Sequence, residues 1–153
     1  MRAKPTWLQT VWPDATAQSV LGFTTTCHGG LSSGPFASNN IRFDIGDDPT
    51  AVRANRAELL TAINQHFAAQ NSVAESLPVG LQWLDQVHGS ECIYVDEHSI
   101  NSTPKADAAW TDQAGIGIAI QTADCVPILI ADQRATIVGA AHAGWRGLAA
   151  NII

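Results

Sequence analysis

The stretch TADCVPILIADQRATIVGAAHAGWRG (residues 122–147) contains two apolar segments that predict adjacent strands. Residues 126–131 and 136–141 are rich in Ile, Val, Leu and Ala, a composition typical of strands buried on both faces. Cys125 stands directly before the first strand, and His142 follows the second directly, ahead of a glycine-rich turn. A hydrophobic core requires neither residue, so both are candidates for a functional site.

The rest of the chain carries further strand and helix signals. Residues 29–40 and 70–78 are polar and predict loops. After the quoted stretch, a helix is predicted from Leu148 onward. More strands are predicted over residues 19–25, 80–87, 93–95 and 116–121. Strands interleaved with helices predict an α/β (α+β) fold with a mixed sheet.

The clearest helix signal follows the GDDP motif at residues 46–49. Asp48 is a good N-cap. Pro49 suits the first helical position, because an N–H at this position would have no acceptor within the helix and proline lacks only that N–H. Apolar residues then recur at helical spacing, which predicts one buried face formed by Val52, Leu59, Ile63 and Phe67.

Composition excludes several classes of protein. The 153 residues fit one globular domain, with 46% apolar residues, 14% charged residues and a net charge of −6. Lys and Arg are scattered, so no basic stripe predicts a nucleic-acid partner, and no apolar run approaches the roughly 20 residues that span a membrane. The three cysteines lack paired spacing, and no signal peptide is recognisable, which favours a reducing, cytoplasmic location.

Three residues are candidate metal ligands: His88, Cys125 and His142. Each lies where a predicted strand meets a turn, which is where α/β scaffolds usually present a site. Two imidazoles and one thiolate suit zinc and leave a fourth position open for water or substrate. No CxxC or HExxH signature supports the set. The alternative is a small buried cysteine and two ordinary polar histidines.

Two charged residues add to the candidate site. Asp124 precedes Cys125, and a carboxylate beside a buried thiol is costly unless a positive group or a hydrogen-bond network compensates it. Arg146 lies in a glycine turn that feeds a helix N-terminus, a setting that suits phosphate or carboxylate. An ordinary turn with a surface arginine is an equally good interpretation.

Other polar residues carry less weight. His66 is predicted on the helix surface and His98 in a solvated loop. Cys27 and His28 are adjacent in a loop and form at most an accessory site. Asp107 either caps a turn or lines the site, and its residue type does not decide between the two.

Five short motifs occur together in this chain: GDDP (46–49), QVHG (86–89), KADA (105–108), TADCVP (122–127) and AHAGWRGL (141–148). In combination they resemble the YfiH-like family of laccase-domain or polyphenol oxidoreductase proteins, some of which are called peptidoglycan editing factors. The resemblance implies a four-layer α/β/β/α sandwich with mixed sheets, in which residues 1–153 are a single unit that forms the N-terminal portion of the full domain.

The resemblance also implies a function. His88, Cys125 and His142 would form the metal and catalytic centre, with Asp124 tuning it and with Arg146 and Asn40 contacting substrate or phosphate. The implied enzyme is a zinc-dependent purine nucleoside phosphorylase, acting on adenosine, inosine, guanosine and methylthioadenosine, with adenosine deaminase activity. We expect zinc rather than copper, because laccase chemistry with several coppers requires more than the five histidines present.

Alternative functions remain at this stage. Cys125 as a nucleophile with a histidine base would be a cysteine hydrolase that edits peptidoglycan precursors. A copper-dependent polyphenol oxidase and an inactive fragment or interaction module are the others.

Some features depart from the family pattern. Cys27 replaces a usual arginine, and Asn39 and Arg42 are atypical beside the retained Asn40, so specificity could differ. Family members continue beyond the helix that begins at Leu148. We therefore expect a C-terminally truncated sandwich that self-associates through exposed apolar strand faces.

Overall fold

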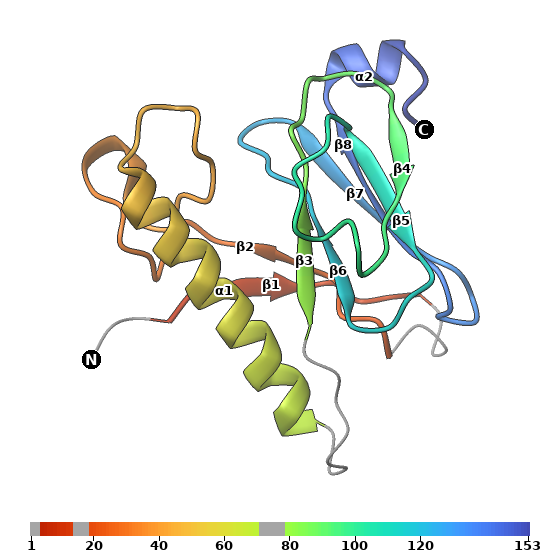
Figure 1. Ribbon diagram of the computed structural model, residues 1–153, viewed down its shortest axis with the longest axis horizontal. Coiled ribbons are helices and arrows are strands. Elements are labelled where there is room, and N and C mark those ends of the chain that lie inside the picture. The colour runs from red at the N-terminus through yellow and green to blue at the C-terminus, as the bar shows by residue number, and fades with distance from the viewer. Residues whose placement is uncertain (1–3, 14–18, 71–78) are drawn as a thin grey trace. The chain divides into compact units, whose positions relative to one another are not determined.

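The computed structural model describes residues 4–13, 19–70 and 79–153, which form two compact units (Figure 1). The first unit comprises residues 4–11 and 22–70, and the second comprises residues 12–13, 19–21 and 79–153. Parallel and antiparallel pairs occur together, so the predicted α+β class with mixed sheets is confirmed. The single unit over residues 1–153 stays a prediction. Most of the predicted linker at 70–78 lies outside the described residues.

The first unit contains a two-stranded ribbon and a long helix. Strand β1 (Trp7–Gln9) pairs antiparallel with β2 (Phe23–Thr25), and the helix is α1 (Pro49–Gln70). The Trp7 ring lies 5.0 Å from that of Phe23 and 5.7 Å from that of His66. His66 is therefore half-buried against an aromatic ring, not at the surface as expected. Strand β1 was not predicted.

Helix α1 begins as its sequence predicts. The Thr50 N–H donates to the Asp48 carboxylate at 2.8 Å, which satisfies one of the helix's unpaired N–H groups. Val52, Leu59 and Ile63 are buried, as the apolar spacing indicated.

Asn55 connects this helix to the preceding loop, which includes the short helix η2 (Gly34–Phe36). The Asn55 side chain is buried, at 1% exposure. Its oxygen accepts a hydrogen bond from the Leu31 N–H at 2.7 Å. Its NH₂ group donates to the Ser32 hydroxyl and to the Asn40 carbonyl. The predicted polar loop is thus fixed by one buried side chain.

The second unit is built on a four-stranded sheet with the order β4-β5-β8-β7 (Figure 1). Only the β4–β5 pair is parallel. A separate parallel pair, β3–β6, packs nearby, and a short helix follows β8. The elements are β3 (Gly80–Trp83), β4 (Cys92–Tyr94), β5 (Ala108–Thr111), β6 (Ile116–Ala119), β7 (Val126–Ala131), β8 (Val138–Ala143) and α2 (Trp145–Ala149).

Several details differ from the sequence-based expectation. Strand β3 ends at Trp83 rather than at residue 87, and it pairs with β6. Strand β8 includes His142, which was expected to follow the strand, and helix α2 begins at Trp145 rather than at Leu148. Strand β5 was missed. Strand β7 is not buried on both faces, since Val126 is 59% and Ile130 52% exposed. The reason is its position at the edge of the four-stranded sheet.

Apolar side chains gather on both faces of this sheet. The main core cluster contains Leu84, Val95 and Ala109, with isoleucines of β6 packed against it. The opposite face holds a groove of about 250 Å³ with Ala108 and Ala141 among its lining residues. Larger side chains, including Trp110, Ile130 and Ile153, also line this groove and are partly exposed. Among the described residues, no helix combines the length and apolarity needed to cross a membrane.

The partly exposed apolar side chains that line this groove predict that copies of the chain associate through this face. Ile130→Lys places a charge on that face and should lower the apparent mass if copies associate there. Light scattering after size-exclusion chromatography measures the mass, with Leu8→Lys, at a 71% exposed position of the other unit, as control. A wild-type chain that is monomeric at all concentrations contradicts the expectation.

The turn between β7 and β8 generates a second prediction. The Asp132 carboxylate accepts the Ile137 N–H at 2.9 Å and the Thr136 N–H at 2.6 Å. These hydrogen bonds lower the pKa of Asp132 from 3.8 to about 2, and the bond from the Ile137 N–H has the largest effect. Because the folded pKa lies below the unfolded one, the stabilisation is present above about pH 4 and is lost as pH falls towards 2.

Asp132→Asn should therefore lower the melting temperature at pH 7, and the difference from wild type should shrink between pH 4 and 2. Thermal unfolding by circular dichroism across this range measures it, with the exposed Glu58→Gln as control. If the melting-temperature difference between wild type and Asp132→Asn stays constant down to pH 2, the ionised Asp132 carboxylate is not its cause.

Candidate metal centre

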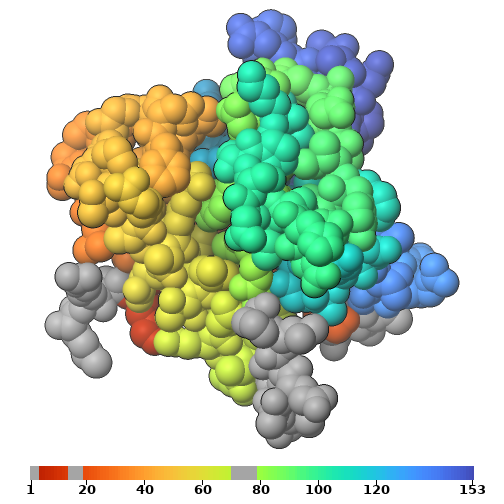
Figure 2. All heavy atoms as spheres, viewed as in Figure 1, coloured from red at the N-terminus to blue at the C-terminus, as the bar shows by residue number. Residues whose placement is uncertain are grey.

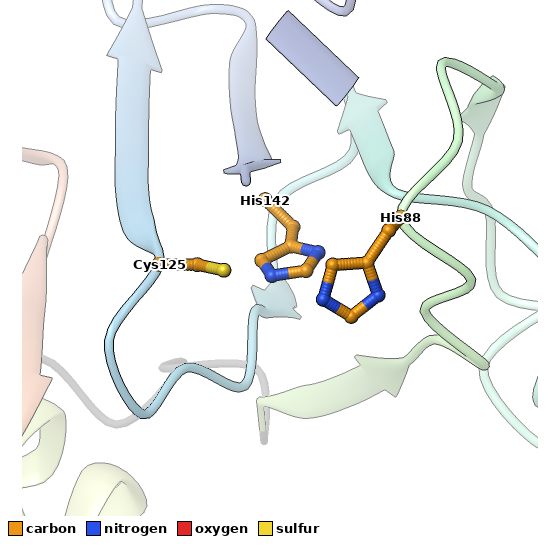
Figure 3. A group of neighbouring side chains, drawn as sticks. All are labelled: His88, Cys125 and His142. Carbon is orange, nitrogen blue, oxygen red and sulfur yellow. The ribbon is translucent and has the colours of Figure 1, made fainter. Parts of the chain in front are cut away.

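Three candidate residues from separate segments lie together in the second unit. Their ligand atoms, the imidazole nitrogens of His88 and His142 and the Cys125 sulfur, all lie within 4.8 Å of one another. Figure 3 shows the side chains pointing toward one another, with the His142 ring between the other two. The β7–β8 register causes part of this meeting, because Pro127 lies opposite His142 and so brings Cys125 close.

The three side chains differ in burial. His142 is 3% exposed, whereas His88 and Cys125 are half-buried. The two imidazole rings lie 4.7 Å apart, edge to face. The cluster is therefore anchored in the protein at His142 and accessible through its other two members.

Gly144 leaves the space in which the cluster forms. A Cβ atom at this position would lie 3.1 Å from the Cys125 sulfur and 3.2 Å from Cδ2 of His88. Both distances are shorter than ordinary van der Waals contact, so a side chain here would push the cluster apart. The turn that the sequence suggested for anion binding thus has a second, steric role.

Asp107 holds two of the three residues. Its buried carboxylate accepts a hydrogen bond from Nδ1 of His142 at 2.8 Å and from the backbone N–H of His88 at 2.9 Å. It also accepts the N–H groups of Gly89 at 2.7 Å and Val87 at 3.1 Å. These are four donors to one carboxylate.

The electrostatics of Asp107 favour its ionised form. Burial raises its pKa, but the hydrogen bonds from His142 and the 87–89 backbone outweigh burial, and the net pKa lies below the usual value. Because an ionised carboxylate only accepts, Nδ1 of His142 carries the hydrogen. In the neutral ring, a hydrogen on Nδ1 leaves the lone pair of Nε2 free for a metal ion, the arrangement typical of histidine ligands.

Sequence reasoning left the role of Asp107 undecided. The available signal was an acid placed between Ala106 and Ala108, both of which are buried, directly before a strand. A charged residue between two buried alanines is expensive without partners, but neither the burial of these alanines nor the partners, which lie 18 to 35 residues away, can be recognised from the local sequence.

The other candidates stand outside the cluster of ligand atoms. Asp124 is exposed and Cys125 only half-buried, so the supposed cost of a desolvated carboxylate does not arise. Arg146 is also exposed and lies over the Trp145 ring, 5.0 Å from its centroid, in the five-residue helix α2. Figure 2 shows residues 145–153, in the darkest blue, on the surface of the second unit. Roles for Asp124 and Arg146 in the site stay predictions.

Asn40 belongs to the first unit, where it holds its own loop. Its amide donates to the Arg42 carbonyl and to Asp47, and its oxygen accepts the Arg42 N–H. Contact with substrate stays a prediction. Cys27 is exposed beside His28, and His98 is exposed as expected.

The donor set fits a tetrahedral metal ion. Zinc with Zn–N of about 2.1 Å and Zn–S of about 2.3 Å requires ligand atoms about 3.5 Å apart. The ligand atoms observed within 4.8 Å would have to approach one another by at most about 1.3 Å, which side-chain rotation permits. His88, Cys125 and His142 could thus hold zinc and leave one position open.

Comparisons with known proteins identify the family of this chain. Residues 21–153 match the family described as multi-copper polyphenol oxidoreductase laccase. A purine nucleoside phosphorylase of Pseudomonas aeruginosa is 41% identical over 147 residues, which are 96% of this chain and 53% of that protein. The purine nucleoside phosphorylase YfiH of Escherichia coli is 37% identical, over 93% of this chain and 52% of its own.

Two crystal structures have the same fold. YlmD from Geobacillus stearothermophilus superposes with a TM-score of 0.80 at 35% identity, over 95% of this chain and 52% of its own. A Neisseria meningitidis protein superposes with a TM-score of 0.78 at 34% identity, over 95% and 53%. The chain spans about half the length of the curated relatives it matches.

The tight space at Gly144 generates a third prediction. Gly144 has φ −73°, which alanine adopts freely, so Gly144→Ala tests contact with the cluster and not backbone strain. We expect zinc affinity to fall roughly tenfold or more, since overpacking costs about 1–3 kcal/mol. Chelator competition measures the affinity, with Trp145→Ala at the exposed neighbouring position as control. Unchanged zinc binding by Gly144→Ala argues against a metal ion between these three side chains.

Proposed function

The chain belongs to the multi-copper polyphenol oxidoreductase laccase family, and we propose that it carries the metal centre of a zinc-dependent purine nucleoside phosphorylase. The observation that carries the proposal is the convergence of His88, Cys125 and His142 over a buried, ionised Asp107. Relatives named purine nucleoside phosphorylases, which are 37–41% identical over nearly all of this chain, support it. The proposed substrates are purine nucleosides, such as inosine and adenosine, and inorganic phosphate.

The proposed reaction is phosphorolysis. The bond between ribose C1′ and the purine nitrogen breaks, a bond from C1′ to a phosphate oxygen forms, and a proton ends on the released base. When bound, zinc would supply a Lewis acid at the open fourth position of the Cys/His₂ set. Asp107 contributes by keeping the hydrogen on Nδ1 of His142, so that Nε2 stays available.

Arg146 is the proposed phosphate contact. Helix α2 begins immediately after Gly144, and a Cβ atom at Gly147 would lie 3.5 Å from the His142 carbonyl oxygen. The guanidinium therefore belongs to a segment packed next to the centre, and its permanent charge and planar donors suit a phosphate. Asn40 is proposed as a further substrate contact, and Asp124 as a residue that tunes the centre, on family resemblance.

Adenosine deamination is the second proposed activity. Zinc nucleobase deaminases also use a Cys/His donor set, which is the observation that favours it. In this reaction water adds to C6 of the purine and ammonia leaves, so phosphate is not consumed. Dependence on phosphate therefore separates the two activities.

A cysteine hydrolase is less well supported. A nucleophilic thiol requires a base within hydrogen-bond reach, and in the described part of the chain no hydrogen bond joins the Cys125 thiol to either imidazole. All three cysteines of the chain are free, which suits the reducing cytoplasmic location that we propose.

Metal content and turnover test the proposal together. Elemental analysis of the zinc-loaded chain should give about one zinc per chain, as a three-ligand site requires. Cys125→Ala and His142→Ala should lose it, whereas the exposed controls Cys92→Ala and His98→Ala should retain it. Chromatography of inosine reactions should then show free base only when phosphate is present.

The possible results distinguish phosphorolysis from the alternative reactions. Base release without phosphate indicates hydrolysis, and ammonia release from adenosine indicates deamination. Zinc retained by both ligand variants contradicts the three-residue site. Turnover that survives complete zinc removal and is abolished by Cys125→Ala favours the cysteine nucleophile.

A further inference from the structure

We propose that Asp107 is a positioning residue that sets both imidazoles of the centre from a single carboxylate. It orients His142 through the ring and His88 through the backbone. The consequence for zinc binding rests on the proposed metal centre, but the positioning itself rests only on contacts within the second unit.

Asp107 can position other groups because its own backbone is held on two sides. Its N–H donates to the Glu91 carbonyl at 3.1 Å, and its carbonyl accepts the His142 N–H at 2.7 Å. The side chain is fully buried, at 0% exposure. The carboxylate therefore cannot turn away to solvent, and its oxygens are fixed relative to β8.

The contact with His142 is made through the ring. One carboxylate oxygen lies 2.8 Å from Nδ1 in a buried environment, where such a bond is strong. This bond selects the tautomer and fixes the rotation of the ring about its attachment. Nε2 then faces the cluster whether or not a metal ion is present.

The contact with His88 is made through the main chain. His88 has φ +62°, in the left-handed region that residues other than glycine rarely adopt. Consecutive N–H groups of Val87, His88 and Gly89 all donate to the carboxylate, which is how a backbone turn encloses an anion. The anion thus holds the turn in a conformation that aims the His88 side chain at the cluster.

An amide of the same shape cannot replace this carboxylate. Each of its two oxygens accepts two N–H groups: His88 and His142 on one, Val87 and Gly89 on the other. Asparagine offers one oxygen and one NH₂ group, so either orientation places a donor against two donors. Asp107→Asn should therefore release either the His142 ring or the 87–89 turn.

The experiment compares wild type, Asp107→Asn and the control Asp112→Asn, whose exposed carboxylate accepts a surface hydrogen bond from the Tyr94 hydroxyl. Nitrogen-15 NMR of metal-free protein reports the His142 tautomer, and chelator competition reports zinc affinity. We expect Nδ1–H alone in wild type and control. Asp107→Asn should alter the imidazole signals and weaken zinc binding about 10- to 100-fold, the range for removal of a ligand's hydrogen-bond partner.

The outcomes distinguish this inference from the proposed function. An Asp107→Asn protein with wild-type imidazole signals and zinc affinity overturns the positioning role while leaving the metal centre in place. A wild type that binds no zinc overturns the metal centre, and the metal-free imidazole signals still decide the positioning role.

A variant that fails to fold does not end the test. Wild type alone should then show slow hydrogen exchange at the amides of residues 87–89 and a His142 ring protonated only at Nδ1. Rapid exchange of those amides, or an Nε2–H tautomer, refutes the inference.

Discussion

The candidate centre depends on one buried carboxylate and the four N–H groups that surround it. Burying an ionised Asp107 is costly in isolation, and these hydrogen bonds compensate the cost only when the 87–89 turn and β8 are both in place. The same condition that stabilises the charge therefore assembles the candidate ligands. The arrangement of N–H groups that the Asp107 carboxylate needs is the same arrangement that brings His88 and His142 together.

The sheet positions the third candidate ligand, Cys125, by a separate route. Cys125 comes into range through the pairing of β7 with β8, and no hydrogen bond to Asp107 is needed. Gly144 then keeps the space between the side chains free. The centre thus combines a rigid buried side, at Asp107 and His142, with a more accessible side at Cys125 and His88.

Much of this could be predicted from sequence where the signal is local. Helix α1 has its cap and apolar spacing in adjacent residues, β7 is a continuous apolar run, and most of β8 is apolar. Strands β1 and β5 have only three and four residues, which is too short for a clear apolar pattern. They form because they pair with β2 and β8. The role of Asp107 depends on N–H groups 18 to 35 residues away, and Asp124 is exposed in the bend before β7. No local pattern reports either.

The exposed segment that precedes Cys125 affects which positions of the chain can change in sequence during evolution. Thr122, Ala123 and Asp124 are all exposed, and they adjoin a half-buried ligand, whereas Asp107 and Gly144 are buried and sterically constrained. None of these three positions donates a hydrogen bond to Asp107, so mutations there leave the buried contacts of His142 and the 87–89 turn in place. Exposed positions generally tolerate substitution better than buried ones, so sequence change is expected to accumulate at this rim before it reaches the interior.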